Sequence, residues 1–188
     1  EVAETRVSIG WNHPPFEIPP AIYAEWDQRA KGAAAQAGWD ARFSAYAAAY
    51  PELAHEFTRR MAGELPAHFS AAVAAAVAAA NAKGETVATR KASQLALSQL
   101  APHLPELIGG SADLMGSVFT NWPGSKVVAR STPGNIVNFG VREFAMAAIT
   151  NGMALHGGFI PETGTFLTFS DYSRNALRMA ALMKLRNI

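Results

Sequence analysis

The stretch Leu107-Ile-Gly-Gly-Ser111 decides the fold class of this 188-residue chain. Its apolar start is typical of a buried strand, and the glycine pair predicts a tight turn at the strand's end. Residues 136–139, Ile-Val-Asn-Phe, predict a second strand, and residues 157–160, Gly-Gly-Phe-Ile, predict a third. Helical patterns accompany them at residues 89–100, 141–155 and 171–185. Strands that alternate with helices of this length predict an α/β fold with a parallel sheet.

Ahead of this layer the sequence is helical and rich in alanine. Four prolines between residues 11 and 20 favour an extended path, and residues 21–31 predict a helix. We expect Gly38 to interrupt the helical pattern. The alanine-rich run at residues 70–83 predicts a further helix that Gly84 ends. The change of character near residue 85 predicts a domain boundary there.

An aromatic stripe follows Gly38. Trp39, Phe43, Tyr46 and Tyr50 are spaced so that they share one face of a helix. Such a stripe predicts packing against a core, and we expect no ligand site from it.

Composition narrows the classes of function. Hydrophobic residues make up 49% and charged residues 16% of the chain, as in globular proteins. The net charge of +1 provides no general field for a nucleic acid or a membrane surface, so neither is an expected partner. The absence of cysteine excludes disulfides and thiol nucleophiles, and it fits a cytoplasmic location. The start has no signal-peptide pattern and no initiator Met, and we expect both ends to be internal to a longer protein.

Polar residues follow the glycine turns, near the predicted carboxyl ends of strands where α/β proteins bind ligands. Arg90 lies at a helix start, and its fork of donors suits a phosphate; a solvated basic pair is the alternative. Ser111, Asp113 and Ser117 follow Gly109 and Gly110, where a bare backbone can approach a ligand; a capped tight turn is the alternative.

Two further segments carry candidate chemistry. Glu143 lies in the first turn of a predicted helix, where the helix dipole favours a carboxylate; ordinary helix decoration is the alternative. Phe166, Phe169 and Tyr172 recur at every third residue and can wall a flat ring; core packing is the alternative.

Several blocks in order resemble the transketolase family, and the resemblance runs along almost the whole chain. The most specific blocks are Trp11…Pro15-Phe-Glu-Ile-Pro19, Ala88-Thr-Arg-Lys-Ala-Ser-Gln94, Leu104-Pro-Glu-Leu-Ile-Gly-Gly-Ser-Ala-Asp-Leu114, Gly140-Val-Arg-Glu-Phe-Ala-Met146 and Leu155-His-Gly-Gly-Phe159. The resemblance implies a thiamin-diphosphate-binding fold with a parallel sheet, preceded by a helical linker region. Residues 1–85 would be the end of the pyrophosphate-binding domain and the linker, and residues 86–188 the N-terminal part of the pyrimidine-binding domain.

The resemblance also implies an activity: transfer of a two-carbon ketol unit from a ketose phosphate to an aldose phosphate by a thiamin diphosphate ylide, in the pentose phosphate pathway. Glu143 matches the glutamate that shares a proton with the aminopyrimidine ring. Phe166, Phe169 and Tyr172 match the family's aromatic pocket around that ring, and Asp113 matches a residue near the cofactor. Arg90 and Ser117 match residues that hold the substrate's phosphate. A homodimer with active sites between subunits is implied.

The sequence departs from the family pattern in places. Val118 stands where Asn is common, and Pro161-Glu-Thr-Gly164 replaces a common Pro-Tyr turn. The family's metal-binding Gly-Asp-Gly segment is missing, so Mg²⁺ would be held by residues outside this segment. We expect the five histidines to be structural. A relative of dihydroxyacetone synthase, and a non-catalytic fragment or helical interaction module, remain alternatives, and the segment alone is expected to be inactive.

Overall fold

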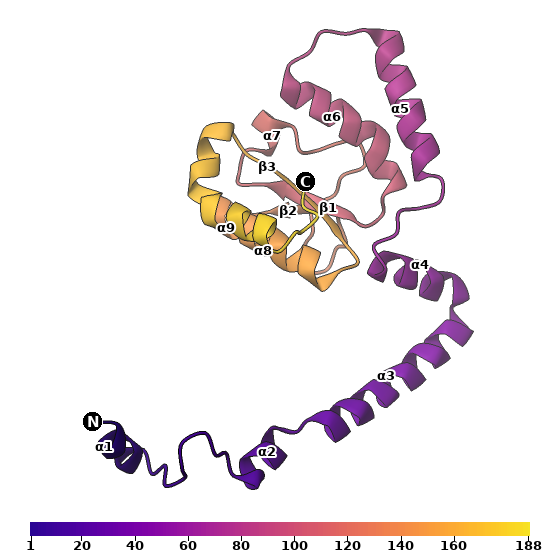
Figure 1. Ribbon diagram of the computed structural model, residues 1–188. Coiled ribbons are helices and arrows are strands. Elements are labelled where there is room, and N and C mark those ends of the chain that lie inside the picture. Colours follow the sequence, from indigo (N-terminus) through magenta and orange to yellow (C-terminus); the bar gives the residue numbers. More distant parts are fainter. The chain divides into compact units, whose positions relative to one another are not determined.

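The computed structural model describes residues 1–188, and the chain divides into two compact units, Glu1–Ala54 and His55–Ile188. Figure 1 shows the elements in chain order. No helix is long and apolar enough to cross a membrane. The predicted boundary near residue 85 lies in the connection between two helices of the second unit and stays a prediction.

The first unit is helical. It contains α1 (Val2–Ser8), α2 (Pro20–Trp26) and α3 (Arg29–Ala49), and α4 (Pro51–Met61) begins in it. Pro20 and Pro51 open their helices because a proline at the first position loses no intrahelical hydrogen bond. The predicted helix at residues 21–31 is split at Asp27, whose Oδ1 accepts a hydrogen bond of 3.1 Å from the Arg29 backbone N–H.

The expected interruption at Gly38 is wrong, because α3 runs unbroken through it. A single glycine inside a helix costs only about 1 kcal/mol relative to alanine, and the alanines around it are the strongest helix formers. The predicted core packing of the aromatic stripe is also wrong within this unit, since α3 buries none of its residues. The rings contact each other instead, with Trp39 and Phe43 stacked at 5.0 Å and Tyr46 and Tyr50 at 5.3 Å.

The second unit is built on a three-stranded parallel sheet, which confirms the predicted fold class. The strands are β1 (Leu107–Ser111), β2 (Ile136–Asn138) and β3 (Ile160–Gly164), in the order β2-β1-β3. Gly109 on the central strand pairs with Ile136 on one side and with Glu162 on the other.

The third strand lies later in the sequence than predicted. Gly157 and Gly158 both have φ of +80°, so they form the turn that leads into β3. Residues 161–164, interpreted from sequence as a turn, belong to β3 itself.

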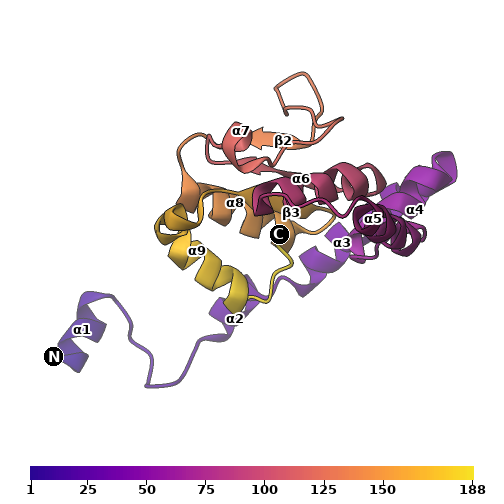
Figure 2. The same cartoon turned by 90° about the horizontal axis from the view of Figure 1, so that it is seen from above.

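Helices cover both faces of the sheet (Figures 1 and 2). They are α5 (Phe69–Lys83), α6 (Thr89–Leu100), α7 (Met115–Val118), α8 (Glu143–His156) and α9 (Ser170–Leu182), with 3-10 turns η1 (Ala101–His103) and η2 (Leu167–Phe169). Gly84 ends α5 in the left-handed conformation with φ of +56°, as predicted. One face packs Leu104, Leu107, Trp122 and Ile136 with Leu97 of α6, and the other packs Ala112 and Phe139 with Met146 of α8.

A buried ion network fixes the end of α4 to the start of β1. Arg59 donates to Glu106 Oε1 at 2.9 Å and to the two carboxylate oxygens of Glu56 at 2.8 and 2.7 Å. The Arg59 and Glu106 side chains are 9% and 4% exposed. Arg60 donates to Glu56 from the more exposed side of the helix, at 2.7 Å. Two arginines beside Glu56 lower its pKa to about 2, chiefly through the hydrogen bonds from Arg59.

Candidate functional site

A small cavity lies at the carboxyl ends of β1 and β2, the edge where parallel sheets bind ligands. Its volume is about 170 Å³, and it is lined by Ser111, Asp113, Met115, Gly116, Asn138 and Gly140. Asp113 was predicted, and Asn138 was not singled out although its place at the end of a predicted strand was a usable signal.

The backbone after β1 turns sharply to expose Asp113. Asp113 is in the left-handed region with φ of +63°, a conformation that Asp tolerates better than most residues. The Ser111 Oγ accepts a hydrogen bond of 3.2 Å from the Leu114 backbone N–H. The capped turn considered from sequence therefore exists, but Ser111 caps it and the Asp113 carboxylate remains exposed at the cavity.

Glu143 is the first residue of α8 and is 8% exposed. Gly140 turns the chain ahead of it with φ of +66°, and Arg142 donates to the Phe139 carbonyl oxygen at 2.9 Å. The Glu143 carboxylate makes no hydrogen bond or ion pair within the chain. A largely buried acceptor at a helix N-terminus without a partner is suited to bind a donor from a ligand.

Arg90 lies beside an aromatic ring, that of Phe119, which sequence reasoning missed. The guanidinium of Arg90 lies 5.5 Å from the centre of the Phe119 ring, and the ammonium of Lys91 lies 5.9 Å from it. Phe119 ends α7, two residues after Ser117, in the left-handed conformation with φ of +61°. Cation–π contacts of this kind hold positive charge in place. No local pattern in the sequence marks Phe119.

The three predicted aromatic residues form a row after the end of β3. The ring centres of Phe166 and Phe169 are 5.7 Å apart, and those of Phe169 and Tyr172 are 6.1 Å apart. Phe166 is 38% and Tyr172 is 67% exposed. The core-packing alternative is therefore wrong for these two rings, and they offer flat apolar surface to a ligand. No hydrogen bond or ring contact joins the row to Glu143.

A third buried glutamate lies on β3, beside the central strand. Glu162 on β3 is 5% exposed, and its Oε2 has no hydrogen-bond partner. Burial raises its pKa to about 7. Its position was noted from sequence only as a departure from the family pattern.

No group of three or more His, Asp or Glu side chains that could hold a metal ion occurs in the chain. His68 and His103 lie with ring centres 5.3 Å apart, without a third ligand.

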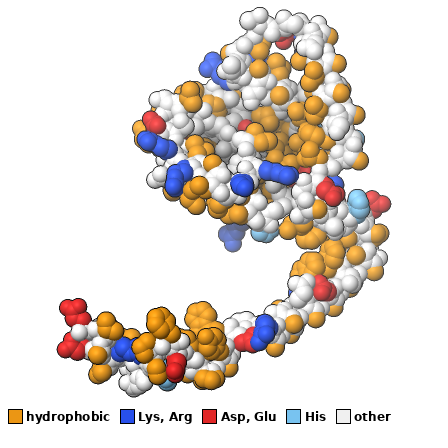
Figure 3. Space-filling view, viewed as in Figure 1, with side chains coloured by type: hydrophobic (Ala, Val, Ile, Leu, Met, Phe, Trp, Pro, Cys, Tyr) orange, Lys and Arg blue, Asp and Glu red, His pale blue; other side chains and the backbone are white.

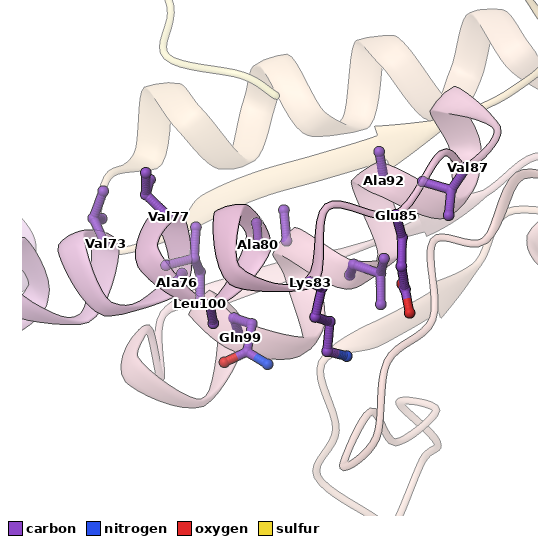
Figure 4. A pocket seen from close by; sticks show the side chains of 13 residues that line it. Val73, Ala76, Val77, Ala80, Lys83, Glu85, Val87, Ala92, Gln99 and Leu100 are labelled. Carbon is purple, nitrogen blue, oxygen red and sulfur yellow. The ribbon is translucent and has the colours of Figure 1, made fainter.

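An apolar groove lies away from these residues, between α5 and α6. Its volume is about 350 Å³, and Val73, Val77, Ala80 and Leu100 point into it (Figure 4). Figure 3 shows the hydrophobic side chains that gather over these two helices. The groove offers few groups for chemistry.

Comparison with known proteins identifies the family. Residues 85–188 match the family model described as "Transketolase, pyrimidine binding domain", and residues 1–66 match "Transketolase, thiamine diphosphate binding domain". The chain is 58% identical to a transketolase 2 of Xanthobacter flavus over 188 residues, which is 100% of this chain and 27% of that protein. It is 52% identical to transketolase 1 of Escherichia coli (strain K12), again over its full length and 28% of the relative.

Solved structures of transketolases are also similar to this chain. A transketolase from Leishmania mexicana superposes with a TM-score of 0.81 at 34% identity, covering 99% of this chain and 28% of that one. A Pichia stipitis transketolase in complex with sedoheptulose 7-phosphate gives 0.80 at 34% identity, covering 94% and 27%. The chain thus spans little more than a quarter of the relatives that it matches.

Proposed function

The chain belongs to the transketolase family, and from that premise we propose that the complete protein containing it transfers a two-carbon ketol unit from a ketose phosphate to an aldose phosphate. The single observation that carries the proposal is Glu143, a largely buried carboxylate without a partner at a helix N-terminus. It lies within the segment that matches the pyrimidine-binding domain. A solved relative, the transketolase from Pichia stipitis, is in complex with the sugar phosphate sedoheptulose 7-phosphate.

The residues present fit thiamin diphosphate on structural grounds. Glu143 supplies an acceptor that lacks a donor, and the row from Phe166 to Tyr172 supplies exposed flat surface. When bound, the cofactor supplies the carbanion chemistry that protein side chains lack. Glu143 would hold or release a proton at a carboxyl oxygen toward the bound aminopyrimidine ring. The aromatic row would orient that ring and shield it from water.

The substrate's phosphate is proposed to bind at Arg90 and Ser117. The cation–π contact with Phe119 fixes the guanidinium, so less side-chain entropy is lost when it binds a phosphate. Asp113 contributes a carboxylate at the cavity between β1 and β2. Mg²⁺ is proposed to be held by residues outside this segment, and a homodimer is proposed from the family resemblance.

The test is the Glu143→Gln variant of the complete protein, with Glu64→Gln as the matched change at an exposed glutamate. We expect Glu143→Gln to lose at least about 100-fold in ketol-transfer rate, the usual contribution of a positioned proton-transfer group, while its thermal unfolding stays near that of the wild type. Glu64→Gln should keep full activity. Near-wild-type activity of Glu143→Gln at saturating cofactor would refute the assignment, and transfer to formaldehyde in preference to aldose phosphates would favour the dihydroxyacetone synthase alternative.

A further inference from the structure

The parallel register places Glu162 on the same face of β3 as Gly164, two residues before the point where the proposed phosphate-binding segment packs on the strand. Paired residues of parallel strands point to the same face of the sheet, so Glu162 shares a face with Gly109, and Gly164 shares it with Ser111. A Cβ atom built on Gly164 would lie 2.5 Å from Thr120 Cγ2 and 3.4 Å from Val118 Cγ2. Within the segment at residues 117–120, Val118 and Thr120 therefore pack on β3 at Gly164, two residues along the same face from Glu162.

The Glu162 carboxyl lies against Gly109, where the backbone carbonyl of Glu162 leaves no room for a Cβ atom. A Cβ atom on Gly109 would lie 2.9 Å from Glu162 Oε2. That Oε2 is buried without a partner, and so is the Oγ1 of Thr120, which belongs to the overlying segment. A buried carboxyl without a partner is tolerated far better when it is neutral than when it is ionised.

No positively charged group stabilises the ionised form of the Glu162 carboxyl. The titratable groups on the elements around it are Arg90 and Lys91 on α6, Glu106 ahead of β1, Glu143 and His156 on α8, and Lys184 and Arg186 after α9. Glu106 is already bound to Arg59, while Arg90 and Lys91 lie over Phe119. Burial alone is responsible for the raised pKa of Glu162.

We infer that Glu162 is a positioning residue for the segment at residues 117–120: the neutral carboxyl lets the segment pack on β3, and the ionised carboxylate displaces it. This inference rests on the proposed function, because that function gives the segment its role in phosphate binding. The chain then carries its own pH control over how well it holds a phosphorylated substrate, separate from the proton transfer at Glu143.

The size of the effect follows from proton linkage. With a pKa of about 7 in the packed state, the carboxyl is about 10:1 neutral at pH 6 and about 1:10 at pH 8. In an opened state with the ordinary pKa of 4.5 it is ionised at both pH values. The equilibrium constant for opening therefore rises about tenfold between pH 6 and pH 8.

Hydrogen–deuterium exchange of the complete protein tests the movement directly. Protection of the peptide covering residues 115–122 is compared at pH 6 and pH 8 after correction for the intrinsic exchange rate. We expect the wild type to open about tenfold more at pH 8, and Glu162→Gln to show no such step. Glu162→Leu serves as a second neutral variant, and Glu64→Gln, at an exposed glutamate, is the control and should keep the step. A step that persists in both neutral Glu162 variants overturns the inference.

Kinetics test the consequence. In the wild type the KM for an aldose phosphate should rise between pH 6 and pH 8 with the step seen in exchange, and this rise should be absent in Glu162→Gln. The KM for a non-phosphorylated aldehyde should not follow the step. A pH step in exchange without the matching change in KM overturns the positioning role. If the complete protein transfers no ketol unit, the proposed function fails, and the exchange result alone supports or overturns the movement.

Discussion

Replacing Arg59 by alanine should destabilise the second unit far more than replacing its neighbour Arg60. Arg59 binds Glu106 and Glu56 in a network whose Arg59–Glu106 pair is 9% and 4% exposed. Glu106 Oε2 already lacks a partner, so removal of Arg59 leaves a buried carboxylate with no partner for either oxygen. Removing one member of a buried ion pair costs about 3–5 kcal/mol. Arg60 binds only Glu56, on the more exposed side, and its loss should cost less than about 1 kcal/mol.

The measurement is urea denaturation of the complete protein carrying each variant. Arg59→Met combined with Glu106→Leu provides the decisive comparison, because replacing a whole buried pair by apolar side chains is often neutral. We expect the double variant to recover most of the stability that Arg59→Ala loses. The reasoning is refuted if Arg59→Ala is no costlier than Arg60→Ala, or if the double variant is as unstable as Arg59→Ala.

Three further predictions concern Glu162, Gly109 and Arg90. The free energy of unfolding should fall by about 3 kcal/mol as pH rises from about 4.5 to about 7, because the folded state keeps Glu162 protonated where the unfolded chain has released the proton. Thermal unfolding of the wild type and of Glu162→Gln across this pH range measures the fall. Equal dependence of stability on pH in the two proteins would contradict the prediction. Gly109→Ala should not yield folded protein, since its Cβ would lie 1.7 Å from the Glu162 carbonyl oxygen; a circular dichroism spectrum and melting curve like those of the wild type would disprove this. Arg90→Ala should raise the KM for aldose phosphates at least about tenfold through loss of a charge-assisted hydrogen bond, with Lys91→Ala as the matched control, and an equal effect of both variants would count against the assignment.

Sequence patterns predicted the helices and strands whose formation depends on neighbouring residues in the chain. The helix at Thr89–Leu100 has the bounds predicted, and Gly84 ends α5 as expected. The strand at Leu107–Ser111 was also predicted, but the turn expected at Gly109 and Gly110 is wrong, because both glycines are paired within the strand. The third strand was placed too early, because Gly157 and Gly158 resemble the start of a buried run although their positive φ values make them a turn. The continuity of α3 through Gly38 reflects a sum of alanine propensities that outweighs one unfavourable residue.

Sequence alone could single out only those site residues that lie next to the ends of predicted strands and helices. Asp113 follows β1 and Glu143 begins α8, so position alone marks them. Phe119 acquires its contact with Arg90 through packing between α6 and the end of α7, and a 29-residue separation in sequence hides that contact. Glu162 looked like part of a turn, and only the register with Gly109 shows that its carboxyl is buried.

The order of the strands also has a consequence for the timing of synthesis. The central strand β1 ends at Ser111, and its partner β3 ends at Gly164, 53 residues later (164 − 111). At about 5–20 residues per second of translation, β1 waits roughly 3–10 s before both of its neighbours exist. Until β3 is made, β1 can pair only with β2, so the nascent chain exposes one open edge of the central strand and is a better client for a chaperone than the finished protein.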